Sequence, residues 1–325
     1  MAIMKNRLEK LDHYQQQHRK TGIAFAAFKK FSDDQSSGLA SMIAFWAFFS
    51  VFPLLLVLVT ILGYVLPEST RTSVLSNVAA YFPLLDTSTV HGLTGSWWPV
   101  VFGLFTAIWS GTAVARTTEQ AFNAVWGIKR VDRPGFVAKM KHSLLALVTI
   151  GLGLVLSVVI SSLAMGNSSG VDVSWWQRLL GYVISIALDI GIFVAAFRLL
   201  TSKKVGLRDV LPGAIVAGLA FWILQEVSSF IIANRLQSAQ SVYGTFATVI
   251  VMLWWFYLQA QVTLLGAQLN VVLKERLHPR SLVGGPETEA DRRALEAYAE
   301  EGTYHESEEV DGYVEGEPAE ERVRR

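Results

Sequence analysis

Polar side chains that interrupt long apolar segments are the residues of this sequence whose chemistry needs an explanation. A carboxyl, amide or hydroxyl group inside a membrane is costly, so each one has to meet a partner, water or a ligand. The sequence places such groups at the following positions: Asp189, Gln225, Gln259, Thr263, Gln268 and Asn270. We refer to this set as the candidate polar interior.

Asp189 is the sharpest member of the set, because it lies near the middle of the apolar segment 179–200. Arg198 is nine residues further on and about half a turn round a helix, so it is not the internal partner and is expected to snorkel to the membrane surface. Asp189 is therefore expected to face another helix, a hydrated cavity or a cation. A protonated carboxyl group in an interhelical hydrogen bond is the alternative.

The other members of the set fall on two later apolar segments. Within residues 242–273, Gln259, Thr263 and Asn270 share one helical face, while Gln268 lies nearly opposite. A helix with polar groups on two sides cannot face lipid on either, so this segment is expected to be central in a bundle. Gln225 follows a stripe of small residues on segment 210–232, and packing against a neighbouring helix is the favoured interpretation there.

Residues for other kinds of chemistry are missing or scattered. The sequence has no cysteine, so disulfides and thiolate metal sites are excluded. The six histidines do not pair at metal-ligand spacing, and no Gly-rich phosphate loop or Ser-His-Asp layout is evident. No basic stretch carries the stacking aromatic residues that an RNA platform needs. We expect no enzymatic activity, no metal, no cofactor and no nucleic-acid partner.

The long apolar segments predict membrane spans. Residues 41–66 contain no charge, and as a helix they would be about 39 Å long, enough to cross a hydrocarbon core of about 30 Å with some tilt. Pro53 leaves the carbonyl group of Phe49 without its usual donor, so this helix is expected to be kinked, with Ser50 helping the backbone to adjust. Further spans are predicted at residues 97–115, 143–165, 179–200, 210–232 and 242–273.

Charge asymmetry predicts the orientation of these spans. Residues 1–38 carry seven Lys or Arg residues and residues 116–142 carry six, whereas the alternate loops offer only Arg71, Arg178 and Arg235. Cytoplasmic loops are the ones enriched in Lys and Arg. The expected fold class is therefore all-α: a polytopic bundle of six transmembrane helices with both termini in the cytoplasm.

Outside the spans, the chain divides by composition into three parts. Residues 1–38 form a basic arm, read either as a helix on an anionic membrane face or as a solvated segment. Residues 39–277 form the transmembrane domain. Residues 278–325 form an acidic tail, with 14 acidic and five basic residues from position 282 onward, which is expected to be mostly disordered apart from one short helix around residues 291–300.

A polar helical face follows the second predicted span. Arg116, Glu119 and Asn123 recur at offsets of three and four, opposite a row of apolar residues. This face is compatible with two interpretations: it caps a cavity from the cytoplasmic side, or it is a solvated helix surface.

Three separated motifs fall in order along the chain: AFWAFFSVFPL at 44–54, AFNAVWG at 121–127 followed by Arg130 and Arg133, and a closing pattern that includes YGT at 243–245, WWFY at 254–257 and GAQLN at 266–270. Together they resemble the YihY/BrkB family of bacterial inner-membrane proteins. The family commonly has Glu where this chain has Gln268. The resemblance covers about residues 22–277 and implies a six-span helical membrane protein. Family members have carried the label ribonuclease BN, and others have been connected to serum resistance and to lipid or lipopolysaccharide export.

The kinked first span, Asp189 and the two-sided polar last span favour a protein of the bacterial inner membrane that transports or handles lipid or another envelope amphiphile through a polar groove. The expected partners are membrane lipids, with envelope proteins or a second copy of the chain as further candidates. A non-catalytic scaffold for envelope-biogenesis partners is the alternative, and a membrane-bound ribonuclease is the less favoured one.

Overall fold

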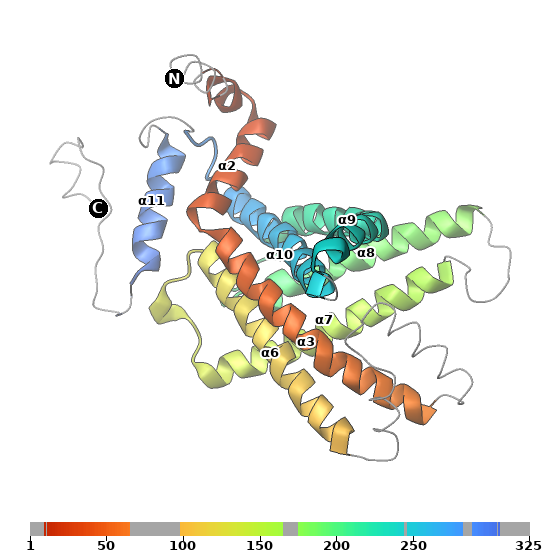
Figure 1. Cartoon of the computed structure of the whole chain (residues 1–325). Coiled ribbons are helices and arrows are strands. Elements are labelled where there is room, and N and C mark those ends of the chain that lie inside the picture. Colours follow the sequence, from red (N-terminus) through yellow and green to blue (C-terminus); the bar gives the residue numbers. More distant parts are fainter. Residues whose placement is uncertain are drawn as a thin grey trace, which may run out of the picture. The chain divides into compact units, whose positions relative to one another are not determined.

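The computed structural model describes residues 10, 12–65, 98–164, 175–243, 246–281, 288–303 and 305, and these residues contain helices and no strand. The predicted all-α class is therefore confirmed for this part of the chain. The helices (Figure 1) are α2 (Arg19–Asp33), α3 (Ser36–Val65), α6 (Trp98–Val125), the 3-10 helix η1 (Arg130–Asp132), α7 (Phe136–Ala164), α8 (Trp175–Leu199), α9 (Leu207–Tyr243), α10 (Phe246–Lys274) and α11 (Glu289–Glu301).

Four helical stretches among the described residues are long and apolar enough to cross a membrane: Ser36–Leu54, Leu179–Leu199, Leu207–Gln225 and Val249–Lys274. They coincide with the first, fourth, fifth and sixth predicted spans. The second and third predicted spans fall on α6 and α7, which are not among these four. The count of six spans and the cytoplasmic location of both termini remain predictions.

The described chain forms two compact units. Unit 1 consists of Met1–Gly38, Glu119–Phe221 and Gln261–Arg325, and unit 2 consists of Leu39–Thr118 and Trp222–Ala260. Several helices contribute to both units, because the division falls within α3, α6, α9 and α10. Nearly all of the polar contacts described below lie in unit 1.

In unit 2, α3 remains helical through Pro53. The buried hydroxyl of Ser50 donates to the carbonyl oxygen of Ala47 at 2.7 Å, so it bonds within its own turn rather than to Phe49. On α6, the large side chains of Phe102, Phe105 and Trp109 are exposed along one face. In a membrane such a face would be covered by lipid acyl chains.

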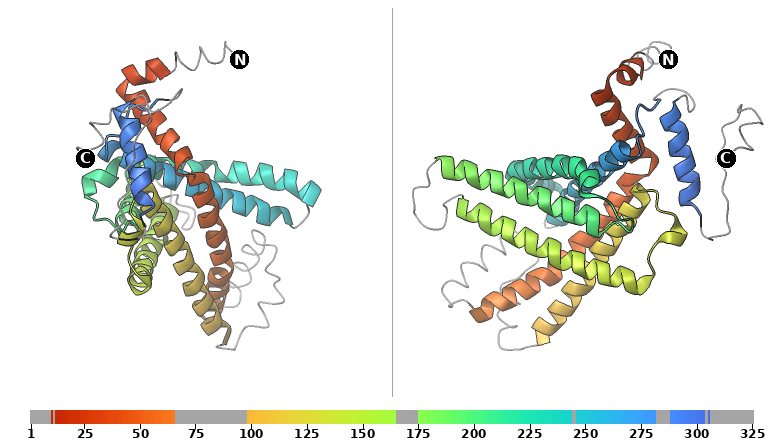
Figure 2. Two further views of the ribbon diagram at one scale, coloured as in Figure 1. Left: turned by 90° about the vertical axis from the view of Figure 1, so that its left-hand side faces the viewer. Right: turned by 180° about the vertical axis from the view of Figure 1, so that it is seen from behind.

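In unit 1, the core is built around aromatic contacts between helices. Phe122 and Phe197 are fully buried with ring centroids 5.2 Å apart, which joins the end of α6 to α8. Phe193 then contacts Phe221 at 5.8 Å and joins α8 to α9. Helix α7 packs along α8, as the right-hand view of Figure 2 shows, with Gly153 against Ile192.

Membrane topology gives the first prediction. Reporter fusions after Leu277 and within residues 67–96 should report opposite sides of the membrane, because the first span separates an inner from an outer segment. A second pair, within residues 126–135 and 166–174, should also differ, since α7 lies between them. Equal signals within the first pair would contradict the cytoplasmic termini, and equal signals within the second would remove α7 from the spans.

Candidate functional site

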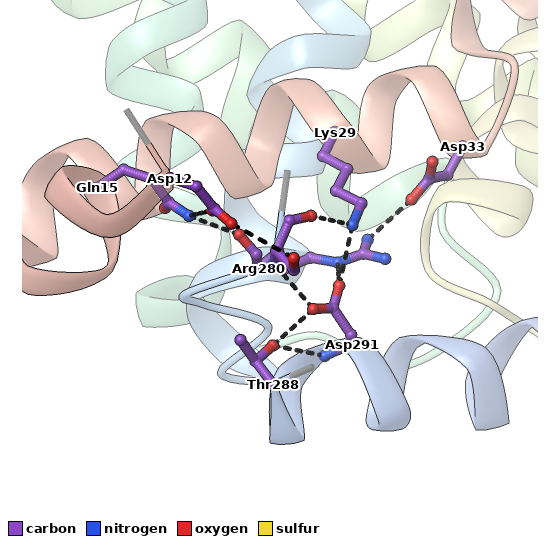
Figure 3. Close-up of polar contacts among 8 residues, drawn as sticks. Asp12, Gln15, Lys29, Asp33, Arg280, Thr288 and Asp291 are labelled. Atoms are coloured by element: carbon purple, nitrogen blue, oxygen red, sulfur yellow. Dashed lines mark hydrogen bonds and ion pairs between the residues drawn. The ribbon is translucent and has the colours of Figure 1, made fainter. Parts of the chain in front are cut away.

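Unit 1 contains a cluster of ionised side chains centred on Asp291, which lies in the first turn of α11 (Figure 3). Its Oδ1 atom accepts from Nε of Arg280 at 3.0 Å and from Nζ of Lys29 at 3.1 Å. Its Oδ2 atom accepts from the backbone N–H of Ser281 at 2.8 Å and from the hydroxyl of Thr288 at 2.7 Å. We call these five residues the Asp291 clamp, because they join α2, the segment after α10 and α11.

The guanidinium group of Arg280 extends the clamp toward the N-terminal arm. Its terminal nitrogen lies 3.0 Å from a carboxylate oxygen of Asp33, and its backbone carbonyl oxygen accepts from Nε2 of Gln15 at 2.6 Å. Gln15 also donates to Asp12 at 2.9 Å. Residues of the basic arm are thereby in contact with the chain that follows α10.

Hydrogen bonds together affect the pKa of Asp291 more than burial does, and they keep this carboxyl group ionised. Burial raises the pKa of Asp291, but the bonds from Ser281, Thr288, Arg280 and Lys29 together lower it from 3.8 to about 2. For Arg280, burial lowers the pKa, yet its bond to Asp291 and the neighbouring acidic groups leave it raised. Both groups are ionised at neutral pH. Because each charge meets a partner, the clamp is suited to holding segments together rather than to chemistry.

Gln268 lies in unit 1, at the corner between α2 and α3. Its Nε2 group donates to Asp34 at 2.7 Å and to the hydroxyl of Ser36 at 3.0 Å. Asp34 also accepts from Lys30 at 2.7 Å, and both of these side chains are almost fully buried. Gln35, between the two helices, has a φ of 50°, which places it in the left-handed region. Gln268 therefore uses its donor to hold this corner.

Asn270 joins α10 to α9. Its Oδ1 atom accepts from the backbone N–H of Gly213 at 2.6 Å, and the residue is fully buried. A methyl group on Gly213 would collide with the carbonyl oxygen of Gly266 and with Asn270, so only glycine fits this crossing. The Nδ2 atom of Asn270 is buried without a hydrogen-bond partner among the described residues.

The remaining members of the candidate polar interior are divided between the units. Asp189 is buried in α8 with 6% of its surface exposed, and Thr263 is half-buried on α10, both in unit 1. Gln225 is exposed on α9 and Gln259 is half-buried on α10, both in unit 2. The prediction that the set lines a polar interior remains a prediction.

The polar face after the second predicted span is not uniform. Glu119 and Asn123 are buried, with 3% and 1% of their surface exposed, whereas Arg116 is half-buried and donates to the carbonyl oxygen of Thr112 in its own helix. Asn123 exchanges two bonds with Ser202, donating to its hydroxyl at 2.8 Å and accepting from its backbone N–H at 2.9 Å. Neither carboxylate oxygen of Glu119 has a hydrogen-bond partner in the described part of the chain.

The pKa of Glu119 reflects this burial. Desolvation raises it, while the charges of Lys139 and His142 on α7 and the nearby hydroxyl of Ser202 lower it without cancelling the effect. Glu119 lies one turn beyond the predicted second span, which ends near residue 115. The sequence left open whether this face caps a cavity or is solvated, and the burial of Glu119 and Asn123 shows that these two side chains are not solvated.

The Asp291 clamp was not anticipated from the sequence. One local signal was available: Thr288 is followed three residues later by Asp291, which is the spacing of a capping box. In the structure Thr288 is the N-cap of α11 and accepts from the backbone N–H of Asp291. The expected short helix in the acidic tail is thus present as α11, and residues 306–325 lie outside the described residues. The described residues contain no group of three or more potential metal ligands.

Comparison with known proteins connects this architecture to a family. A family model described as virulence factor BrkB matches residues 27–291. The ribonuclease-like protein YfkH of Bacillus subtilis (strain 168) is 26% identical over 263 residues, which cover 77% of this chain and 94% of that protein.

Two further relatives are named only as UPF0761 membrane proteins. One from Vibrio vulnificus (strain YJ016) is 24% identical over 278 residues, covering 81% of this chain and 87% of its own length. One from Pseudomonas aeruginosa (strain LESB58) is 25% identical over 270 residues, covering 78% of this chain but only 63% of its own length. No solved structure matches the chain.

The crossing of α9 and α10 gives a stability prediction. Gly213→Ala should lower the thermal stability of the purified protein, because overpacking against a backbone carbonyl costs about 1–3 kcal/mol or more. Gly191→Ala on α8 is the matched control, since a methyl group there meets no described atom within 4 Å. The control should be neutral or slightly stabilising, because Ala favours helix over Gly by about 0.5–1 kcal/mol. Equal melting temperatures for both variants would contradict the close crossing.

The clamp gives a second prediction. Asp291→Ala should release α11, since breaking a buried ion pair costs about 3–5 kcal/mol. Faster hydrogen exchange and proteolysis between residues 288 and 303 would report the release. Glu289→Ala removes only an exposed pair with Arg293 and should leave both rates unchanged.

The pH dependence of the clamp has a defined sign. The folded pKa of Asp291 is depressed, so its stabilising contribution is present above 3.8 and is lost as the pH falls through about 2. The wild-type α11 should therefore undock in acid over that window, and the Asp291→Ala variant should show no such transition. Protection of α11 that is unaffected by the Asp291 substitution would show that other contacts hold the helix.

Proposed function

This chain belongs to the BrkB (YihY/BrkB) family of membrane proteins, and on that premise we propose that it moves a lipid or another envelope amphiphile across the bacterial inner membrane. The family membership and the four apolar helices make it an integral membrane protein. The transport activity and the class of molecule transported are what we propose.

The observation that carries the proposal is the burial of Asp189 within a candidate membrane span. On α8, the apolar side chains Leu179, Leu180 and Val183 are exposed, while Asp189 is buried. A carboxyl group at such a depth costs about 2.5–3.5 kcal/mol on insertion scales, so a group without a function would be unexpected. An amphiphile needs both surfaces: a polar interior for its headgroup and an apolar exterior for its acyl chains.

A scaffold for envelope-biogenesis partners is the second candidate, and the Asp291 clamp favours it. Ion pairs join α2 to α11 into one folded body outside the spans, and the tail beyond it is strongly acidic. Such a body is suited to contacts with basic partner surfaces. The two candidates differ in which residues they need, because a scaffold requires α11 in place but not the charge of Asp189.

The test of the transport proposal is a lipid-scrambling assay on the protein reconstituted in vesicles, combined with complementation of a deletion strain. Asp189→Asn removes the charge but keeps the shape and hydrogen bonding, so it should fold normally and lose activity by about tenfold or more, equivalent to at least about 1.4 kcal/mol in the rate-limiting barrier. Ser185→Ala, one turn earlier on the same helix, is the matched control and should retain activity.

Each outcome decides between the candidates. Full scrambling by Asp189→Asn across a range of pH would end the proposed role of Asp189. No scrambling by the wild type, with complementation lost only when Asp291→Ala releases α11, would favour the scaffold. A ribonuclease assay on the same preparations tests the activity that the name of the Bacillus relative suggests.

A further inference from the structure

The carboxyl group of Glu119 is placed where an ionised acid is unstable. It is 97% buried, and neither oxygen has a hydrogen-bond partner among the described residues. An ionised carboxylate in such a position costs more than a neutral acid, since burial penalises the charge and the neighbouring groups do not cancel that penalty. The group therefore needs either a proton or a positively charged ligand.

The neighbours of Glu119 select between these two. Lys139 and His142 on α7 are the cationic groups that act on it, and neither forms an ion pair with it in the described structure. The positive charge of Lys139 close by disfavours the binding of a metal ion or an ammonium headgroup. A proton is the remaining ligand, because it neutralises the acid without adding a charge to the cluster.

Ser202, in the segment after α8, is a further neighbour of Glu119. Asn123 donates its amide N–H to the Ser202 hydroxyl and accepts from the Ser202 backbone N–H. The Ser202 hydroxyl also lies close enough to Glu119 to lower the pKa of that carboxyl group, without reversing the effect of burial.

Asp209 is an acid that does pair with a neighbouring lysine, although a third of its side chain is exposed. In the first turn of α9 it accepts from Lys274 at 2.8 Å, and this bond, the foremost cause, lowers its pKa. Lys274 in turn lies over the ring of Trp126 at 5.4 Å. Glu119 has lysine and histidine nearby and still remains unpaired with them.

We propose that Glu119 is a proton-binding site that exchanges with solvent on the side of Lys139 and His142. His142 is exposed on α7, so this side of the site borders solvent. A hydronium ion of the solvent gives a proton to a carboxylate oxygen of Glu119 and leaves as water, and the reverse step returns the proton to water, so atoms and charge balance. The site is independent of which molecule the protein handles.

The raised pKa of Glu119 determines whether folding stability rises or falls with pH. Between the ordinary value of 4.5 and the folded value, the native state holds the proton and the unfolded state does not. Stability therefore falls as the pH rises through this window. Glu119→Gln mimics the protonated acid, so it should fold and should lack this loss.

The experiment is a melting-temperature profile of the full-length protein in detergent, from about pH 4 to about pH 9, a range that brackets the ordinary and raised values of a buried carboxyl group. Wild type and Glu119→Gln should melt alike at the acid end, and the variant should become the more stable of the two as the pH rises. Asp209→Asn is the matched control: it removes a paired acid, so it should be less stable than wild type at neutral pH.

A second variant separates proton binding from simple packing. Lys139→Met removes a charge that lowers the pKa of Glu119, so the loss of stability should extend to higher pH, and the carboxyl band in an infrared titration should shift in the same direction. Parallel profiles for wild type and Glu119→Gln would overturn the proposal. So would a failure of Glu119→Gln to fold, because a site that is protonated in the native state tolerates its neutral isostere.

Discussion

The close approach of α9 and α10 at Gly213 and Gly266 is the constraint on which the arrangement of unit 1 depends. Because no side chain separates the two backbones there, Asn270 can reach the N–H group of Gly213 and the rotation of α10 is fixed. With α10 in that rotation, Gln268 faces Asp34 and Ser36 and holds the corner before α3. The end of α10 then delivers Arg280 to Asp33 and Asp291.

Charges outside the predicted spans follow one rule, with an informative exception. Asp291, Asp34, Asp209 and Glu301 each accept from a basic side chain, namely Arg280, Lys30, Lys274 and Arg133. Pairing of this kind offsets part of the desolvation of both partners, although burial still leaves the pKa of Glu301 raised. Among the described buried acids of unit 1 outside the spans, Glu119 departs from it, although Lys139 and His142 are near enough to act on its pKa. This departure is the observation on which the proposed proton-binding role of Glu119 depends.

The sequence predicted the positions of helices better than it predicted which side chains would form hydrogen bonds and ion pairs with one another. Apolar runs were sufficient to place the helices α3, α6, α7, α8, α9 and α10, and spacing placed Glu119 and Asn123 on one face. They left open whether the N-terminal arm is a helix, which the structure shows as α2. Spacing could not tell that Gln268 would bond to Asp34, 234 positions away, or that Lys29 would reach Asp291, 262 positions away. Periodicity reports which face of a helix a residue occupies, whereas the partner depends on how helices far apart in sequence meet. The Thr288 cap was the one part of the clamp with a local signature.

The hydrogen bonds of the candidate polar interior also bear on which of its residues could line a polar path through the protein. Gln268 donates to Ser36 at the corner between α2 and α3, and Asn270 accepts from Gly213 where α9 and α10 cross. Both residues therefore act in helix packing. Of the candidate polar interior in unit 1, Asp189 alone carries a group that can be ionised, and it is buried on α8. Under the proposed function, the carboxyl group that an amphiphile headgroup would meet in this unit therefore lies on α8. Helix α8 also exposes apolar side chains at Leu179 and Val183, so the same helix would offer surroundings to the acyl chains.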